Sequence, residues 1–347
     1  MSAVEQKVAA IYMAKDAVGP LGTPLMLEEV MFCPVLEWLG DVLSASGVER
    51  FFVACEPEWR EQAAACMDGL SATVVTEEPL AAFEAFVAET EKTEKVLRID
   101  MPTLPFQGGL GQFSTFKELM DASLYCRDDI MKTFVTSGVK VIDPQNTYID
   151  PRASVAPGAC ILPGTIIRGR SFIETRAEIG PNSVVNNCTV GEGTKINQSQ
   201  VNDSVFGKNV RVGPFAYVRP GCRVADNAKV GDFVELKNSS LGEKTSLAHL
   251  TYIGDSDVGA GVNFGCGCVT VNYDGDKKYR CTVGDRSFIG CNTNLIAPVS
   301  VGEGAYIAAG ATITKDVPAD ALAVARARQE NKEGWAKRRR DAKQSKY

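Results

Sequence analysis

The sequence predicts two folds in one chain, a small α/β domain followed by a hexapeptide-repeat parallel β-helix. Residues 1 to about 125 alternate short apolar runs with Ala-, Glu- and Leu-rich stretches, whereas isoleucine or valine recurs at every sixth position after Tyr148. The length of 347 residues is also more than one compact core usually holds. We therefore expect two domains.

In the first half, four apolar runs are suited to buried strands of a parallel sheet, because helix-like stretches separate them. The runs are residues 9–13, 49–54, 72–76 and 95–100. Composition favours helices over 27–46 and 58–70, and a linking helix over roughly 115–137. The expected division is an α/β domain (1–125), a helical linker (126–140), a β-helix (141–325) and a basic tail (326–347).

The second half repeats with a period of six, which neither a helix (3.6) nor a strand (2) produces. In a hexapeptide β-helix each hexad is one short strand and a turn, and its aliphatic residue points into the coil. Each coil then needs its neighbours to bury that residue. The aliphatic ladder is Ile149, Val155, Ile161, Ile167, Ile173, Ile179, Val185, Val212, Val218, Val224, Val230, Leu236, Leu247, Ile253, Val283, Ile289, Leu295, Val301, Ile307 and Ile313, with a slip before Val212.

The longest break in the repeat is residues 271–282, VNYDGDKKYRCT, which contains a turn signal and is expected to loop out of the coils. Insertions in repeat proteins often line the binding face, although a solvated loop without a role remains an alternative.

His249 is the only histidine in the chain. It follows the ladder residue Leu247 by two positions, so it should not lie in the core, and the polar residues Tyr252 and Asp255 follow it. Imidazole titrates near neutral pH, so His249 could serve as a general base. A structural histidine is the alternative.

Four cations in the same half could recognise phosphate: Arg219, Lys237, Lys277 and Lys278. Arg219 and Lys237 are three hexads apart, so we expect them to stack on one face of neighbouring coils. Solvated surface lysines without a role are the alternative.

Composition excludes other classes of function. The net charge of -6 argues against nucleic acid as the main ligand. The sequence has no run of about 20 apolar residues and no signal peptide in MSAVEQKVAA, so we expect no membrane insertion and a cytoplasmic location. The eleven cysteines lack zinc-site spacing and are expected to be small buried hydrophobes, and no metal site is predicted in the β-helix.

Several long motifs carry a resemblance to a known family: GPFAYVRPG, VGDFVELKNSSLG, LAHLTYIGD, VNFGCGCVTVNYDG, FIGCNTNLIAPVSVG, IAAGATITKDVP and NKEGW. From about residue 140 to 335 the chain resembles the acetyltransferase domain of the bacterial bifunctional N-acetylglucosamine-1-phosphate uridyltransferase/glucosamine-1-phosphate acetyltransferases. The resemblance implies a left-handed β-helix, a homotrimer with sites between subunits, acetyl-CoA as co-substrate and an amino-sugar phosphate as acceptor.

The same resemblance implies roles for single residues. His249 would be the general base, with Glu235 assisting. The sugar phosphate would be held by Arg219, Lys237, Tyr252, Asn263 and Lys278. Acetyl-CoA would be bound by Cys266, Asn272, Tyr273, Cys291, Ala309 and Arg326. The family has alanine at the first and serine at the second of the two cysteine positions, and a thiol is the weaker hydrogen-bond donor.

The first half departs from the uridyltransferase domain of that family. No arginine follows Thr23, Leu25 stands where a lysine belongs, and about 125 residues replace a domain roughly twice as long. Asp100 matches a metal-binding aspartate, but one carboxylate cannot hold Mg²⁺ against a triphosphate. We expect a degenerate nucleotidyltransferase-like domain that is inactive, with Mg²⁺ needed only if it is active.

The sequence thus predicts N-acetylation of glucosamine 1-phosphate in UDP-N-acetylglucosamine (peptidoglycan precursor) biosynthesis. Three alternatives stay open: retained uridylyl transfer, a non-catalytic sugar-nucleotide-binding scaffold, and another amino-sugar acceptor. The basic tail is expected to be either a disordered solubilising segment or, in its first part around Arg326 and Trp335, a cover for a neighbouring subunit's acetyl-CoA.

Overall fold

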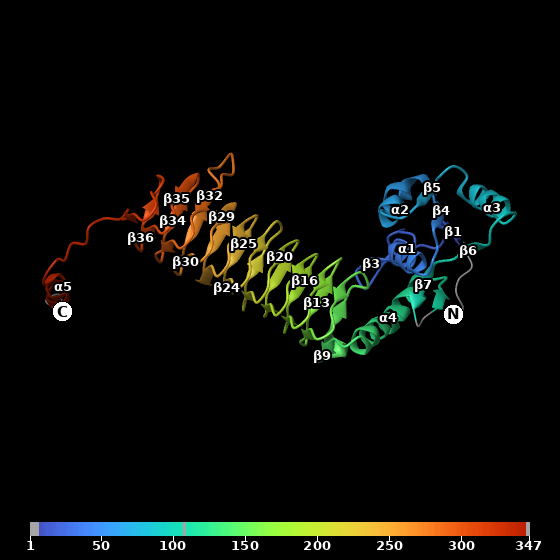
Figure 1. Ribbon diagram of the computed structural model, residues 1–347, viewed down its shortest axis with the longest axis horizontal. Helices are drawn as coiled ribbons and strands as arrows, with labels where there is room; N and C mark the ends of the chain where they lie inside the picture. The colour runs from blue at the N-terminus through green and yellow to red at the C-terminus, as the bar shows by residue number, and fades with distance from the viewer. Residues whose placement is uncertain (1–6, 107–108, 345–347) are drawn as a thin grey trace.

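The computed structural model describes residues 7–106 and 109–344, and its N-terminal part is built on a four-stranded parallel sheet of order β5-β4-β1-β6 (Figure 1). The strands are β1 Val8–Tyr12, β4 Arg50–Ala54, β5 Ala72–Val75 and β6 Val96–Ile99. Each agrees with the expected run to within one residue at either end. The predicted parallel sheet is confirmed.

Helices cover both faces of this sheet. Helices α1 (Val35–Ala45) and α2 (Arg60–Cys66), the latter preceded by the 3₁₀ turn η1 (Pro57–Trp59), share a core with Ile11 of β1. On the other face, Phe83 of helix α3 (Pro79–Thr90) packs with Phe52 of β4. Successive side chains of each strand point to opposite faces of the sheet, so each strand contributes to the apolar core on either face.

The helix expected over 27–46 is wrong in its first part, because residues 29–34 form a hairpin. Strand β2 (Glu29–Val30) pairs with β3 (Cys33–Pro34) across Met31 and Phe32, whose φ angles are 53° and 69°. Two left-handed residues in a two-residue loop match the twist of a hairpin. The helix expected over 58–70 is also shorter than predicted. Helix α3 and the hairpin of β7 (Thr103–Phe106) with β8 (Gly109–Gln112) were not anticipated.

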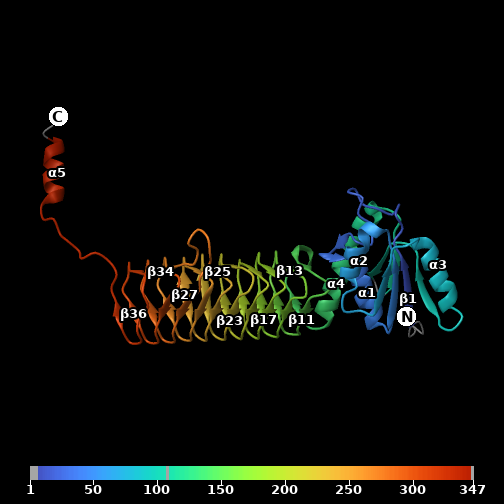
Figure 2. The same cartoon turned by 90° about the horizontal axis from the view of Figure 1, so that it is seen from above.

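The second part is a parallel β-helix, and each coil contributes one short strand to each of three sheets (Figures 1 and 2). The ten-stranded sheet comprises β10 Tyr148–Ile149, β13 Ile166–Arg168, β16 Val184–Asn186, β19 Gln200–Asn202, β22 Tyr217–Val218, β25 Glu235–Lys237, β28 Tyr252–Gly254, β31 Val269–Val271, β34 Asn294–Ile296 and β37 Thr312–Ile313. The nine-stranded sheet comprises β11 Ser154–Val155, β14 Phe172–Ile173, β17 Thr189–Val190, β20 Val205–Phe206, β23 Arg223–Val224, β26 Ser240–Leu241, β29 Ser256–Val258, β32 Cys281–Val283 and β35 Val299–Val301. The eleven-stranded sheet comprises β9 Lys140–Val141, β12 Cys160–Ile161, β15 Glu178–Ile179, β18 Lys195–Ile196, β21 Arg211–Val212, β24 Lys229–Asp232, β27 Ser246–His249, β30 Asn263–Phe264, β33 Phe288–Ile289, β36 Tyr306–Ile307 and β38 Leu322–Ala323.

The aliphatic ladder fills the coils, as its period predicts. Every predicted ladder residue is buried, with at most 6% of its surface exposed. The first coils span three hexads, so that Ile149 pairs with Ile167. The coil from Val185 to its partner Val201 is two residues shorter. The slip is therefore a short coil and not a break in the fold.

Helix α4 (Phe116–Thr136) closes the N-terminal end of the β-helix and lies against β9, β10 and the turn η2 (Pro144–Asn146) (Figure 1). The hydroxyl of Thr115 accepts the Glu118 amide while the Glu118 carboxylate accepts the Thr115 amide, which fixes the start of the helix. Its buried Ile130 and Met131 join the core of the coils. A terminal coil has no neighbour on one side, and α4 supplies one.

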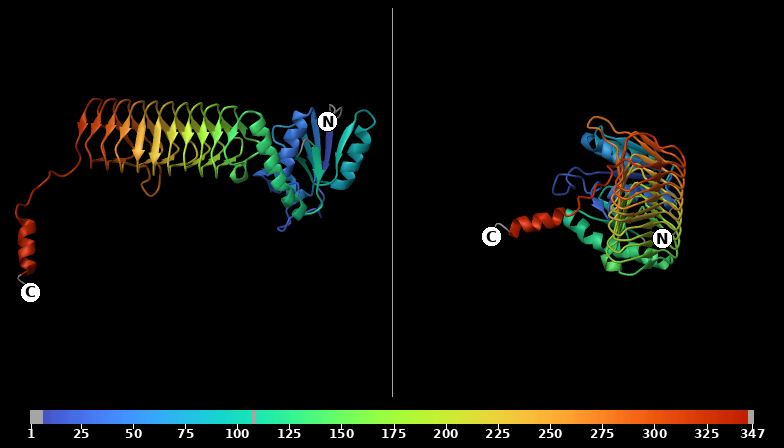
Figure 3. Two further views of the ribbon diagram at one scale, coloured as in Figure 1. Left: turned by 90° about the horizontal axis from the view of Figure 1, so that it is seen from below. Right: turned by 90° about the vertical axis from the view of Figure 1, so that its left-hand side faces the viewer.

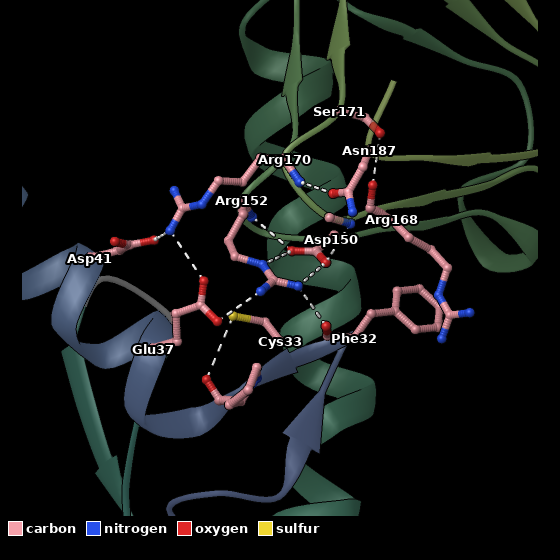
Figure 4. Close-up of polar contacts among 12 residues, drawn as sticks. Phe32, Cys33, Glu37, Asp41, Asp150, Arg152, Arg168, Arg170, Ser171 and Asn187 are labelled. Atoms are coloured by element: carbon pink, nitrogen blue, oxygen red, sulfur yellow. Dashed lines mark hydrogen bonds and ion pairs between the residues drawn. The ribbon is translucent and has the colours of Figure 1, made fainter. Parts of the chain in front are cut away.

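A network of arginines and carboxylates joins helix α1 and the β2–β3 hairpin to the first coils (Figure 4). Asp150, which is fully buried, pairs with Arg152 at 2.7 Å, and Arg152 also bonds Glu37 of α1 at 2.8 Å. Arg152 donates to the carbonyl of Phe32 at 2.7 Å, and the guanidinium of Arg168 lies 4.4 Å from the centre of the Phe32 ring. The β-helix thus holds the hairpin tip in its left-handed conformation.

The opposite end of the β-helix continues into an extended segment and the short basic helix α5 (Trp335–Gln344), which points away from the coils (Figure 3). The last residues of the predicted tail, 345–347 with Lys346, lie outside the described residues, as does the start of the chain (1–6). Among the described residues no helix has the length and apolarity to cross a membrane.

Candidate active site

One corner of the β-helix, where the chain turns from the eleven-stranded into the ten-stranded sheet, carries a column of residues on five successive coils. This corner column is Asp232, His249, Cys266, Cys291 and Ala309. The pairing of β24, β27, β30, β33 and β36 sets these residues at one position of each coil. Beside the column, the amide of Asn292 donates to the Cys266 carbonyl and the amide of Gly310 to the Cys291 carbonyl, each at 2.8 Å.

Asp232 and His249 form a hydrogen-bonded pair at the N-terminal end of the column. Nδ1 of His249 lies 2.6 Å from Oδ1 of Asp232, and both side chains are accessible to solvent. The hydrogen bond from His249 lowers the pKa of the Asp232 carboxyl, so the carboxylate stays ionised and accepts the proton of Nδ1. This tautomer leaves Nε2 of His249 without a proton and able to accept one.

The rest of the column has short side chains, which leaves a track along the corner. Cys266 and Cys291 are exposed, and Arg326 lies at the far end with its Cδ 3.7 Å from where a side chain on Gly310 would begin. Four coil steps at the usual spacing between strands give about 19 Å from His249 to the coil of Arg326. The track suits an extended ligand with an anionic end.

A second group of predicted residues lies on the ten-stranded sheet. Arg219 and Lys237 occupy successive coils, as predicted, because the Arg219 amide donates to Leu236 next to Lys237. The guanidinium of Arg219 bonds Glu235 at 3.1 Å. Tyr252 lies on the next coil, and its hydroxyl occupies the place where a side chain on Gly254 would begin, so glycine makes room for the ring.

Asp255 links this group to the inserted loop. Its carboxylate accepts from Asn238 at 2.6 Å and from the side chain of Asn272, and Nζ of Lys237 lies 3.6 Å away. Burial opposes ionisation, but the two amides and the charges of Lys237 and Lys278 outweigh it and lower the pKa of Asp255. The carboxylate of Asp255 therefore holds both Lys237 and Asn272, at the start of the loop, in position.

The inserted segment loops out of the coils between β31 and β32, as predicted (Figure 2). A bridge between Tyr273 and Lys278 closes it, and the Tyr273 hydroxyl donates to the Gly275 carbonyl at 2.6 Å. At its C-terminal end Arg280 pairs with Asp257 at 2.7 Å, which anchors the loop to the nine-stranded sheet. Lys277 and Lys278 are exposed on this loop.

The predicted residues therefore fall into two groups on one chain, the corner column with Arg326 and the polar group around Asp255. Asn263 lies outside both, exposed at the start of β30, and Tyr273 is 55% exposed on the loop. Glu235 bonds Arg219, and the carboxylate that contacts His249 is Asp232.

Asp232 was not identified from the sequence. It precedes His249 by one position less than three hexads, which is nearly a full coil, and that spacing could have indicated it. The prediction that the cysteines are buried holds for eight of the eleven. Cys160 is half-buried, and the two corner cysteines are exposed because a coil corner turns its side chains outward.

The fold defines a left-handed parallel β-helix protein of the hexapeptide-repeat class, joined to an α/β domain. The family described as bacterial transferase hexapeptide (six repeats) matches residues 203–238 and 280–315.

The C-terminal part is similar to curated relatives named Bifunctional protein GlmU. The relative from Geobacillus sp. (strain WCH70) is 48% identical over 220 residues, covering 63% of this chain and 48% of its own length. The relative from Clostridium perfringens (strain SM101 / Type A) is 49% identical over 223 residues, covering 64% and 49%. The chain thus spans about half the length of the curated relatives it matches. Among solved structures, LpxA from Acinetobacter baumannii aligns over 50% of this chain and 69% of its own, with 19% identity and a TM-score of 0.35.

Proposed function

We propose that the protein transfers the acetyl group of acetyl-CoA to the amino group of glucosamine 1-phosphate, forming N-acetylglucosamine 1-phosphate for UDP-N-acetylglucosamine biosynthesis. The observation that carries the proposal is the Asp232–His249 pair at the head of a track of short side chains. The similarity to relatives named Bifunctional protein GlmU supports the same reaction.

In this mechanism His249 is the general base. Its Nε2 takes the proton from the amino nitrogen as that nitrogen attacks the thioester carbonyl. The C–S bond then breaks, and the imidazolium gives this proton to the leaving sulfur, which releases the CoA thiol. Asp232 keeps the imidazole in the tautomer that can accept this proton and stabilises the imidazolium that forms. The carboxylate of Glu235 assists by holding Arg219.

The two groups of side chains suit the two substrates. Acetyl-CoA would lie along the corner past Cys266, Cys291 and Ala309, with Asn272 and Tyr273 beside it and Arg326 toward its phosphates. The sugar phosphate would contact Arg219, Lys237, Tyr252, Asn263 and Lys278.

We further propose a homotrimer in which neighbouring subunits complete each site. Phe215, Phe233 and Leu250 lie next to the corner column on three successive coils, each more than half exposed and each at a positive φ. Exposed apolar side chains that gather on one face are stabilised when another surface covers them. A second copy packed on this apolar corner would do so, and would enclose the reaction beside His249.

The test is release of free thiol from acetyl-CoA with glucosamine 1-phosphate as acceptor. His249→Ala should lower kcat by roughly 10²- to 10⁴-fold, the usual contribution of a general base. Near-normal turnover in a folded variant would refute the assignment. A panel of other amino-sugar phosphates distinguishes the acceptor, and a scaffold would bind ligand without releasing thiol.

For the N-terminal domain we propose that uridylyl transfer is absent. Asp100 is hydrogen-bonded to Arg98 at 2.9 Å, and the described residues contain no group of three or more His, Cys, Asp or Glu side chains arranged to hold a metal ion. Formation of UDP-N-acetylglucosamine and pyrophosphate from UTP, Mg²⁺ and N-acetylglucosamine 1-phosphate would support the bifunctional alternative instead.

A further inference from the structure

Two exposed thiols lie on neighbouring coils of the corner column. Eight of the eleven cysteines are buried and Cys160 is half-buried, whereas Cys266 and Cys291 are exposed. The pairing of β30 with β33 puts these two residues side by side. The exposed cysteines of the chain are thus neighbours in space, although 25 positions separate them in the sequence.

Their spacing is compatible with a covalent bond. Residues side by side on parallel strands have Cα atoms about 4.8 Å apart, and disulfides join Cα atoms roughly 4.4–6.8 Å apart. The sulfur of Cys291 lies 2.7 Å from where a side chain on Gly265 would begin, so it leans toward the coil of Cys266. Gly265 and Gly267 flank Cys266, and no neighbouring side chain of that segment separates the thiols.

A third cysteine nearby is a poor competitor. Cys268 is buried, and its thiol donates to the carbonyl of Gly290 at 3.1 Å. Burial raises the pKa of this thiol to about 11, so little of the reactive thiolate is present at neutral pH.

We propose that hydrogen peroxide oxidises Cys266 and Cys291 to a reversible disulfide that joins two neighbouring coils. One thiolate attacks the peroxide, the O–O bond breaks, and hydroxide leaves to become water with the thiol proton. The second thiol then attacks the resulting sulfenic acid, forming the S–S bond and releasing a second water. The two thiols supply the two electrons that reduce the peroxide.

The bond would lie on the track, joining two successive positions between His249 and Arg326. This consequence rests on the proposed function: the disulfide closes the part of the corner where acetyl-CoA would bind, and oxidation therefore stops acetyl transfer until a dithiol reductant reopens it. Bound acetyl-CoA should in turn protect the thiols.

The bond itself is tested without reference to activity. The reduced full-length protein is treated with hydrogen peroxide, alkylated, digested with trypsin without reduction and analysed by mass spectrometry. We expect a linked pair of peptides, residues 245–277 with residues 287–315, and a fall of two in the number of free thiols.

Matched variants identify the cysteines in that linkage. Cys266→Ala or Cys291→Ser should abolish the linked peptides, whereas Cys268→Ala and Cys160→Ala should leave them. A linkage that survives Cys266→Ala, or unlinked peptides after oxidation of the wild type, would overturn the proposal.

A second measurement tests the consequence. Peroxide should abolish thiol release from acetyl-CoA by the wild type and dithiothreitol should restore it, while Cys266→Ala keeps the rate of its own reduced form. Acetyl-CoA at about ten times its Kd should slow linkage about tenfold, because mass action leaves few sites free. Full activity in the linked protein would overturn the switch. A reduced protein with no acetyl transfer would instead refute the proposed function and leave the mapped bond in place.

Discussion

At the scale of single residues, Asp232 determines which nitrogen of His249 carries a proton. An amide in its place can donate to Nδ1 as readily as accept from it, so part of the population would hold the tautomer with a protonated Nε2. Asp232 acts through His249 and is a positioning residue.

We predict that Asp232→Asn lowers kcat roughly tenfold, a fraction of what a general base contributes. KM for acetyl-CoA should stay unchanged, and Asp232→Glu should recover part of the rate because it restores the carboxylate. Asp203→Asn, which removes an exposed carboxylate outside both groups of site residues, is the matched control. A rise in KM with unchanged kcat would contradict this role.

Asp255 makes a prediction about pH. Its pKa is lowered in the folded protein, so its ionisation stabilises the fold above the unfolded pKa, and this contribution is lost as the pH falls through the folded pKa. Asp255→Asn should therefore cost about 1–3 kcal/mol at pH 7, the range for a disrupted buried hydrogen-bonding group. In urea titrations the difference from wild type should shrink below about pH 4. A difference independent of pH would contradict the assignment.

At the scale of elements, the junction in Figure 4 depends on one arginine. Arg152 bonds Asp150, Glu37 and the Phe32 carbonyl, whereas the neighbouring Arg170 is 61% exposed and bonds Glu37 and Asp41 at the surface. Removing Arg152 leaves the buried carboxylate of Asp150 without its cation.

We predict that Arg152→Ala costs about 3–5 kcal/mol in the free energy of unfolding, the usual effect of breaking a buried ion pair. Arg170→Ala should cost no more than about 1 kcal/mol, because its own guanidinium is exposed to solvent. Urea unfolding measures both, and limited proteolysis should find the β2–β3 hairpin cleaved faster only in Arg152→Ala. Equal losses in the free energy of unfolding for the two variants would contradict the role assigned to the buried pair of Arg152 and Asp150.

The elements also show what the sequence could reveal. The period of six predicted the ladder because each aliphatic side chain must enter the coil, and the apolar runs located the four strands of the sheet. The hairpin of Glu29–Val30 with Cys33–Pro34 was missed because Met31 and Phe32 carry no turn signal, and contacts from Arg152 and Arg168 hold them. Asp232 was missed because its partner is on the next coil, and only the register brings the two together.

At the scale of the whole molecule, charge is divided unevenly along the chain. Residues 1–125 contain 20 Asp and Glu against 8 Lys and Arg, whereas residues 326–347 contain 3 against 9. The acidic α/β domain and the basic tail lie at opposite ends of the β-helix (Figure 1). The part of the chain between these two segments, which contains the β-helix, carries no net charge. Charge repulsion would therefore not oppose the packing of neighbouring β-helices in the proposed trimer.

The trimer prediction belongs to this scale. Phe233 is 58% exposed and stacks on Phe215 with ring centres 5.4 Å apart. Phe233→Glu should give a monomer with β-rich circular dichroism and little acetyl transfer, because a charge would be buried between copies. Sedimentation velocity distinguishes the states, with Phe172→Glu on the nine-stranded sheet as control. A trimeric Phe233→Glu protein would contradict the proposed interface.

The corner column has one consequence that concerns distance. Each coil adds one strand spacing of about 4.8 Å, so distances along the axis of the β-helix come in multiples of that spacing. The gap between His249 and Arg326 can then change only in such steps. Removing residues 292–309, one complete coil that follows Cys291 and ends at Ala309, would bring Arg326 one coil closer to His249 while keeping every remaining strand in register. The number of coils between His249 and Arg326 would thus set the length of the extended acyl donor that the proposed site accepts.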